Sequence, residues 1–100
     1  MANLYKIERM DNTWDYDVYD SAIVVAESED EATFIHPGTT DELTYYWSGL
    51  DRMWFMYTDD TNSYAITSWL TPSKVSATLI GTAAPHFQPG TVVCASFNAG

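Results

Sequence analysis

Residues 21–26, with the sequence Ser-Ala-Ile-Val-Val-Ala, constrain the fold more than any other segment of this chain. An extended segment of this kind presents apolar side chains on both of its faces. A strand with two apolar faces is covered on both sides and belongs in the interior of a sheet. The sequence therefore predicts an interior strand here, and the other elements must be arranged around it.

A short helix is predicted directly after this strand. Ser28 and Glu31 have the spacing of a capping box, and the acids between them favour the positive end of a helix. The helix must end by His36, because Pro37 disfavours helical geometry in the residue before it. A helix over about 28–36 has only two or three turns, so we expect it to be stabilised by packing on a face of the sheet.

The remaining chain predicts further strands separated by turn-forming residues. A hairpin is expected across residues 58–62, the last two strands are expected to be neighbours, and a helical turn is expected around Asp41–Trp47. The fold class is therefore α+β: one domain over residues 1–100, with a small, mostly antiparallel sheet of four to six strands. The further strands are expected at Leu4–Glu8, Met53–Tyr57, Tyr64–Trp69, Val75–Ile80 and Thr91–Phe97.

Two adjacent aromatic residues in the expected hairpin, Trp54 and Phe55, must point to opposite faces of a strand. If one face of the hairpin is buried, the other exposes large rings, which are typical of protein-binding hot spots. The alternatives are a second small core beneath residues 39–50 and a homodimer seam. The candidate partner-binding residues, including three acids, are Tyr45, Tyr46, Trp47, Trp54, Phe55, Tyr57, Asp15, Asp17 and Asp20.

The charge of the chain is strongly negative and unevenly distributed. Fourteen acids oppose four cations, which gives a net charge of −10, and every acid lies within residues 1–60. Four scattered cations do not form a footprint for a phosphate backbone, so we expect neither direct nucleic-acid binding nor attachment to an anionic membrane. The acids would attract a host protein with a basic surface, or they serve only to keep an aromatic-rich domain soluble.

No catalytic, cofactor or metal site is predicted. The acids from Asp15 onward fail the EF-hand pattern, because Asp20 and Ala26 stand where Gly and Glu are required. His36, His86 and Cys94 have no zinc spacing. We expect His36 to cap a helix end, His86 to lie in a loop and Cys94 to be a small buried residue, so the protein is not predicted to be an enzyme.

Two features of the sequence indicate the cellular compartment: the polarity of the first residues and the number of cysteines. The first acid follows at Glu8 without an apolar signal segment, and no run approaches the roughly 18 apolar residues of a membrane span. A lone cysteine is typical of a reducing compartment. These features predict a cytoplasmic protein.

Four segments of the chain form a distinctive pattern: Tyr16–Ala32, Ile35-His36-Pro37, Leu79–Ala83 and the end Val93–Gly100. Together they resemble a family of small proteins of tailed bacteriophages and prophages. Residues 39–70 are longer and more aromatic than the family pattern. The resemblance implies a phage-encoded accessory protein of the host cytoplasm, and it implies no catalytic residue.

The functional hypothesis is therefore a phage protein that binds, and in one version inhibits, a host protein. A specific version is mimicry of nucleic acid, in which carboxylates occupy the basic groove of a host nuclease, polymerase or anti-phage defence complex. The alternatives are a small-ligand or nucleotide-binding module with an aromatic pocket, and a structural homo-oligomeric phage protein.

Overall fold

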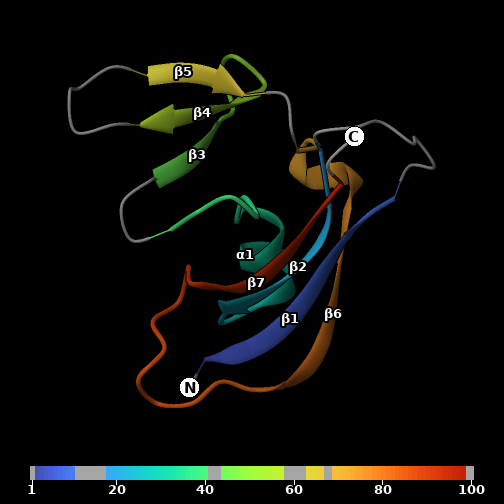
Figure 1. The fold of residues 1–100 in the computed structure, drawn as a ribbon, viewed down its shortest axis with the longest axis vertical. Helices are drawn as coiled ribbons and strands as arrows, with labels where there is room; N and C mark the ends of the chain where they lie inside the picture. Colours follow the sequence, from blue (N-terminus) through green and yellow to red (C-terminus); the bar gives the residue numbers. More distant parts are fainter. Residues whose placement is uncertain (1, 11–17, 41–43, 58–62, 67–68, 99–100) are drawn as a thin grey trace.

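The computed structural model describes residues 2–10, 18–40, 44–57, 63–66 and 69–98. These residues form two antiparallel sheets, one short α-helix and one 3-10 turn (Figure 1). In chain order the elements are β1 (Asn3–Arg9), β2 (Val18–Ala26), α1 (Glu29–Thr33), β3 (Thr44–Ser48), β4 (Met53–Tyr57), β5 (Ser63–Ile66), η1 (Pro72–Lys74), β6 (Val75–Thr82) and β7 (Val92–Asn98). The predicted α+β class is confirmed, although the strands are divided between two sheets.

The larger sheet has the order β6-β1-β2-β7, so β2 is an interior strand as residues 21–26 predict. Val24 and Val25 are adjacent and point to opposite faces, yet both are fully buried. In the register of the two central strands, Tyr5 lies opposite Val24 and Ile7 lies opposite Ala22. These four side chains share the face that forms the main core.

The prediction that the last two strands are neighbours is wrong. β6 pairs with β1 and β7 pairs with β2, so they form the opposite edges of the sheet. The physical reason is that β1 and β2 pair with each other, which leaves only their outer sides for later strands. The connection from residue 83 to 91 therefore has to pass from one edge of the sheet to the other, as Figure 1 shows.

The helix α1 begins where the capping residues predict. The hydroxyl of Ser28 accepts a hydrogen bond from the Glu31 amide at 3.2 Å, and the Glu31 carboxylate accepts one from the Glu27 amide at 3.1 Å. The carboxylate thus reaches one residue further back than in the usual capping box. The helix ends at Thr33, earlier than expected, and its fully buried Ala32 packs on the sheet.

The second sheet contains β3, β4 and β5, and β4 is its central strand. The helical turn expected around Asp41–Trp47 is wrong for the part that the structure describes, because Thr44–Ser48 is a strand paired with Met53–Tyr57. Consecutive aromatic residues favour this extended pairing over a helix. The hairpin between β4 and β5 is confirmed, but β5 ends at Ile66 and Trp69 lies after the strand, buried in the core.

A single hydrophobic cluster joins the two sheets. Tyr5, Ile7 and Val24 contribute from the larger sheet, and Trp54 contributes from β4. In Figure 1 the chain that leaves α1 runs between the larger sheet and β3. The second sheet therefore has one side directed to this core and one side directed away from it.

Candidate protein-binding face

The two sides of the second sheet are set by the register of β3 and β4. Trp47 lies opposite Trp54, and Tyr46 lies opposite Phe55. Because successive side chains of a strand alternate, the two tryptophans share one side and the Tyr46–Phe55 pair occupies the other. Adjacent residues Trp54 and Phe55 are thus separated as the sequence requires.

The inner side carries the anchor of the sheet. Trp54 is only 1% exposed, and its indole nitrogen donates a hydrogen bond to the Leu70 carbonyl at 2.8 Å. The Trp47 ring meets it edge-on, with centroids 5.7 Å apart. Trp54 therefore stabilises the core and is not accessible to a partner in the folded chain. Tyr45 and Trp47 are half-buried against the same core.

The outer side carries exposed apolar groups. The rings of Tyr46 and Phe55 stack with centroids 5.7 Å apart and planes 18° from parallel. Tyr46 is 40% exposed, Met53 is 38% exposed and Leu50, in the turn between β3 and β4, is 94% exposed. We call Tyr46, Met53 and Phe55 the outer aromatic face; Leu50 is exposed in the turn that joins its two strands.

Leu50 and Met53 were not among the residues singled out from the sequence. Met53 is two residues before Phe55, so strand alternation places it on the same side, and this signal was available. Leu50 lies in a turn, where periodicity gives no information. Tyr57 lies in β4 opposite Thr44 and Ser63, but its side chain is outside the described residues.

The predicted acids are only partly located by the structure. Asp15 and Asp17 lie outside the described residues, and Asp20 is exposed on β2, in the larger sheet. Among the described acids, Asp51 lies nearest in sequence to the outer aromatic face, where its carboxylate accepts a hydrogen bond from the Ser48 hydroxyl at 3.0 Å. The structure thus places Asp20 and the aromatic residues on different sheets.

His36 does not cap a helix end, because the helix C-cap is Phe34. It is fully buried, and its Nδ1 accepts a hydrogen bond from the Gly38 amide at 2.9 Å. The imidazole stacks on Tyr45 and meets Trp54 edge-on at a centroid distance of 5.2 Å. Burial lowers the pKa of His36 to about 4, so the side chain is neutral and serves packing between the sheets.

The surroundings of His36 are tightly packed. A Cβ atom added at Gly38 would lie 3.1 Å from the hydroxyls of both Tyr19 and Tyr45, which explains why the residue after Pro37 is glycine. Burial, with a smaller contribution from Tyr19, raises the pKa of Tyr45. Tyr45 is therefore neutral near pH 7, as is His36, and neither ring provides a charged group for acid–base chemistry.

The other residues with reactive side chains are Cys94, in a strand of the larger sheet, and His86, in a loop. Cys94 is exposed in β7, so the prediction that it is buried is wrong; the strand is an edge strand and leaves the thiol uncovered. His86 is exposed in the loop after β6, as expected, beside Phe87. Within the described residues, no three His, Cys, Asp or Glu side chains are grouped so that they could hold a metal ion.

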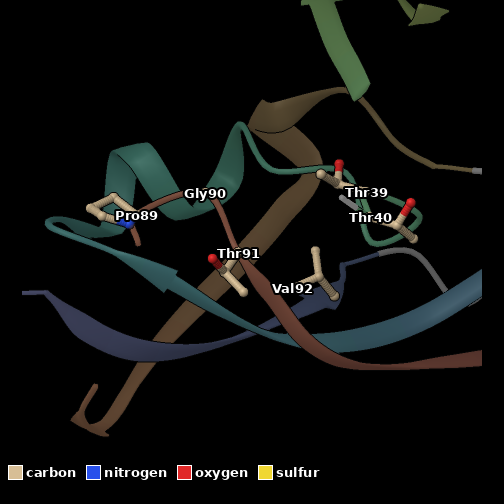
Figure 2. A pocket seen from close by; sticks show the side chains of 6 residues that line it. All are labelled: Thr39, Thr40, Pro89, Gly90, Thr91 and Val92. Carbon is tan, nitrogen blue, oxygen red and sulfur yellow. The ribbon is translucent and has the colours of Figure 1, made fainter. Parts of the chain in front are cut away.

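A hollow of about 480 Å³ lies where the segment after α1 approaches the beginning of β7. Figure 2 shows Thr39 and Thr40 on the first segment, with Thr91 and Val92 on the second. Its remaining lining residues are Pro89 and Gly90. None of these side chains titrates near neutral pH, so the lining provides no general acid or base that would activate its threonine hydroxyls.

Comparison with protein-family models, with curated proteins and with solved structures finds no match to this chain. None of the described helices is long and apolar enough to span a bilayer. Because no comparison assigns a site, the candidate site is chosen from the geometry alone, and it is the outer aromatic face.

Proposed function

We propose that this chain is a phage-encoded accessory protein that binds a protein of the host cytoplasm through its outer aromatic face. The observation that carries this proposal is the stacked pair Tyr46–Phe55, which lies on the side of the sheet that points away from Trp54 and the core. Exposed aromatic rings beside apolar neighbours have the composition of interface hot spots. The proposed action is binding rather than catalysis.

The charge of the chain favours a basic partner. With a net charge of −10, the protein attracts cationic surfaces over several ångströms and repels anionic ones. In this division of roles the acids of residues 1–60 accelerate encounter, and Tyr46 and Phe55 determine how long the complex lasts. The resemblance of both chain ends to phage proteins supports a host protein as the partner.

The test is quantitative capture of host proteins on the immobilised full chain. Tyr46→Ala and Phe55→Ala are each expected to weaken binding of the captured partner by about 2 kcal/mol, or about thirty-fold in Kd. The matched control is Leu79→Ala, which removes a side chain that is 55% exposed on the larger sheet. Thermal unfolding of each variant shows whether the fold is intact.

The proposal fails if the folded Tyr46 and Phe55 variants retain the same partners as the control variant. A salt series separates the two versions of the proposal. Binding that weakens steeply with salt and is competed by duplex DNA supports nucleic-acid mimicry. Binding that persists at high salt supports anchoring by the aromatic residues.

A further inference from the structure

The last quarter of the chain is free of charged residues. Residues 75–100 contain no Asp, Glu, Lys or Arg, although the whole chain has a net charge of −10. In the fold, this neutral segment provides both edge strands of the larger sheet, β6 and β7. Edge strands of soluble proteins are usually protected by charges, because their unpaired backbone groups otherwise pair with another chain.

Both edges carry exposed side chains, including Leu79 and Ile80 on β6, but β7 is the edge with no charged side chain within it or at either end. Val93 is 43% exposed, and Cys94, Ala95 and Ser96 are all exposed. In the part of the chain that the structure describes, the sheet ends at β7, so alternate backbone N–H and C=O groups of this strand point outward. β6, in contrast, follows directly on Lys74, and a lysine beside an edge opposes strand pairing. Register shifts do not separate the two edges, because the pairings of both strands contain them.

We propose that β7 pairs antiparallel with β7 of a second copy, so that two larger sheets join into one continuous sheet. Every neighbouring pair in the sheet is already antiparallel, and a two-fold axis beside β7 preserves that arrangement. This proposal does not depend on the outer aromatic face, which lies on the other sheet.

Charge identifies a second copy as the occupant. A two-fold interface places each residue patch against itself, so any charge in the patch would meet a like charge. Two chains of net charge −10 repel each other wherever their acids meet, and a neutral edge is where that repulsion is weakest. A basic foreign partner would instead be attracted to the acids of residues 1–60. One of these acids, the exposed Asp20, lies on β2 and not on the edge strand itself, so a basic partner would not be directed to β7 by a charge on that strand.

The symmetry predicts which residues meet. If the whole of Val92–Asn98 overlaps with its copy, Ala95 lies opposite Ala95 of the second copy. Cys94 then lies opposite Ser96 of the second copy. Side chains directly opposite in an antiparallel pair have Cβ atoms about 4.5–5.5 Å apart, which lies near the range for a disulfide.

The first experiment measures the association of the full chain by sedimentation equilibrium over a range of concentrations. The wild-type chain is expected to form a dimer, and Ser96→Lys is expected to weaken it at least about tenfold, because lysine on an edge opposes strand pairing. Ser76→Lys makes the same change on β6, where Glu8 lies opposite, and is expected to leave the dimer unchanged. A monomer at all concentrations, or equal weakening by both lysines, would overturn the proposal.

The second experiment uses cysteine cross-linking to locate the seam, and it does not require a measurement of how tightly the dimer associates. In a Cys94→Ala background, Ala95→Cys is expected to give a disulfide-linked dimer under mild oxidation. Leu79→Cys in the same background places an exposed thiol on β6, away from the proposed seam, and is expected to give no disulfide-linked dimer. Preferential cross-linking through residue 79 would place the seam on β6 and contradict the proposal. Dimerisation is expected to be unaffected by Phe55→Ala, so the two proposals can fail separately.

Discussion

The imidazole of His36 lies parallel to the phenol ring of Tyr45, with ring centroids 4.1 Å apart and planes inclined by 11°. Tyr45 belongs to the second sheet, and the edge of the same imidazole packs near Tyr19 of the larger sheet at 5.7 Å. His36 thus connects the two sheets through ring contacts. Its neutral form is required, because Nδ1 accepts the Gly38 amide hydrogen bond.

Stability is therefore expected to fall in mild acid. The pKa of His36 is about 4 in the folded chain and 6.5 in the unfolded chain, so the unfolded chain takes up a proton first as the pH decreases. The contribution of His36 is complete above pH 6.5 and declines by about 3 kcal/mol toward pH 4. Denaturant unfolding between pH 5 and 7, above the ordinary carboxylate range, measures this decline.

The matched controls for this pH effect are two histidine substitutions. His86→Asn removes an exposed histidine and should leave the pH dependence unchanged. His36→Asn retains an acceptor for the Gly38 amide but does not titrate, so the slope between pH 5 and 7 should disappear at a lower overall stability. An unchanged slope in His36→Asn would show that another group causes the acid sensitivity.

Truncation of the two adjacent rings in β4 should have unequal effects. Trp54→Ala removes a ring that is 1% exposed and the hydrogen bond to Leu70, and it is expected to cost about 3–5 kcal/mol of unfolding free energy. Phe55→Ala removes a half-buried ring from the outer side, and a cost of about 1 kcal/mol is expected. Urea unfolding measures both. Equal losses would mean that both sides of the second sheet are buried.

The sequence predicted those elements whose signal is local. Alternation and apolar runs located β1, β2, β6 and β7, and Ser28 with Glu31 located the beginning of α1. The separation of Trp54 from Phe55 followed from strand geometry alone. In each case the determining interaction lies within one strand or one helical turn.

The incorrect predictions concern pairing between distant segments. Nothing near Cys94 in the sequence shows that β7 lies at an edge, and a residue type that is usually buried is therefore exposed there. His36 stands beside Pro37 at the end of a helix-like pattern, but its partners Tyr19, Tyr45 and Trp54 come from three strands. The second sheet itself arises because β3 pairs with β4 rather than with the larger sheet.

The N-cap of α1 gives a third prediction. Ser28→Ala removes the acceptor for the Glu31 amide and is expected to cost about 1 kcal/mol of unfolding free energy. Because the helix packs on the sheet through Ala32, weakening its first turn should lower the stability of the whole fold, and thermal unfolding measures this loss. Ser73→Ala, in an exposed position of η1, is the matched control and should change stability by less than about 0.5 kcal/mol. A similar effect of both substitutions would contradict a capping role.

The turn that carries Leu50 gives the fourth prediction, because it contains a residue in an unfavourable conformation. Among the described residues other than glycine, Arg52 alone has a positive φ, of 57°, and its amide donates to the Ser48 carbonyl at 2.7 Å to close the turn between β3 and β4. The left-handed conformation costs a residue with a Cβ atom about 1–2 kcal/mol, whereas glycine adopts it readily. Arg52→Gly is therefore expected to raise the unfolding free energy by about 0.5–1 kcal/mol after the greater chain entropy of glycine is included.

The control is Arg52→Ala, which removes the same charge but keeps the Cβ atom, so it should give no increase in the unfolding free energy. If denaturant unfolding shows the glycine variant to be no more stable than the alanine variant, the conformation of Arg52 is not a source of strain.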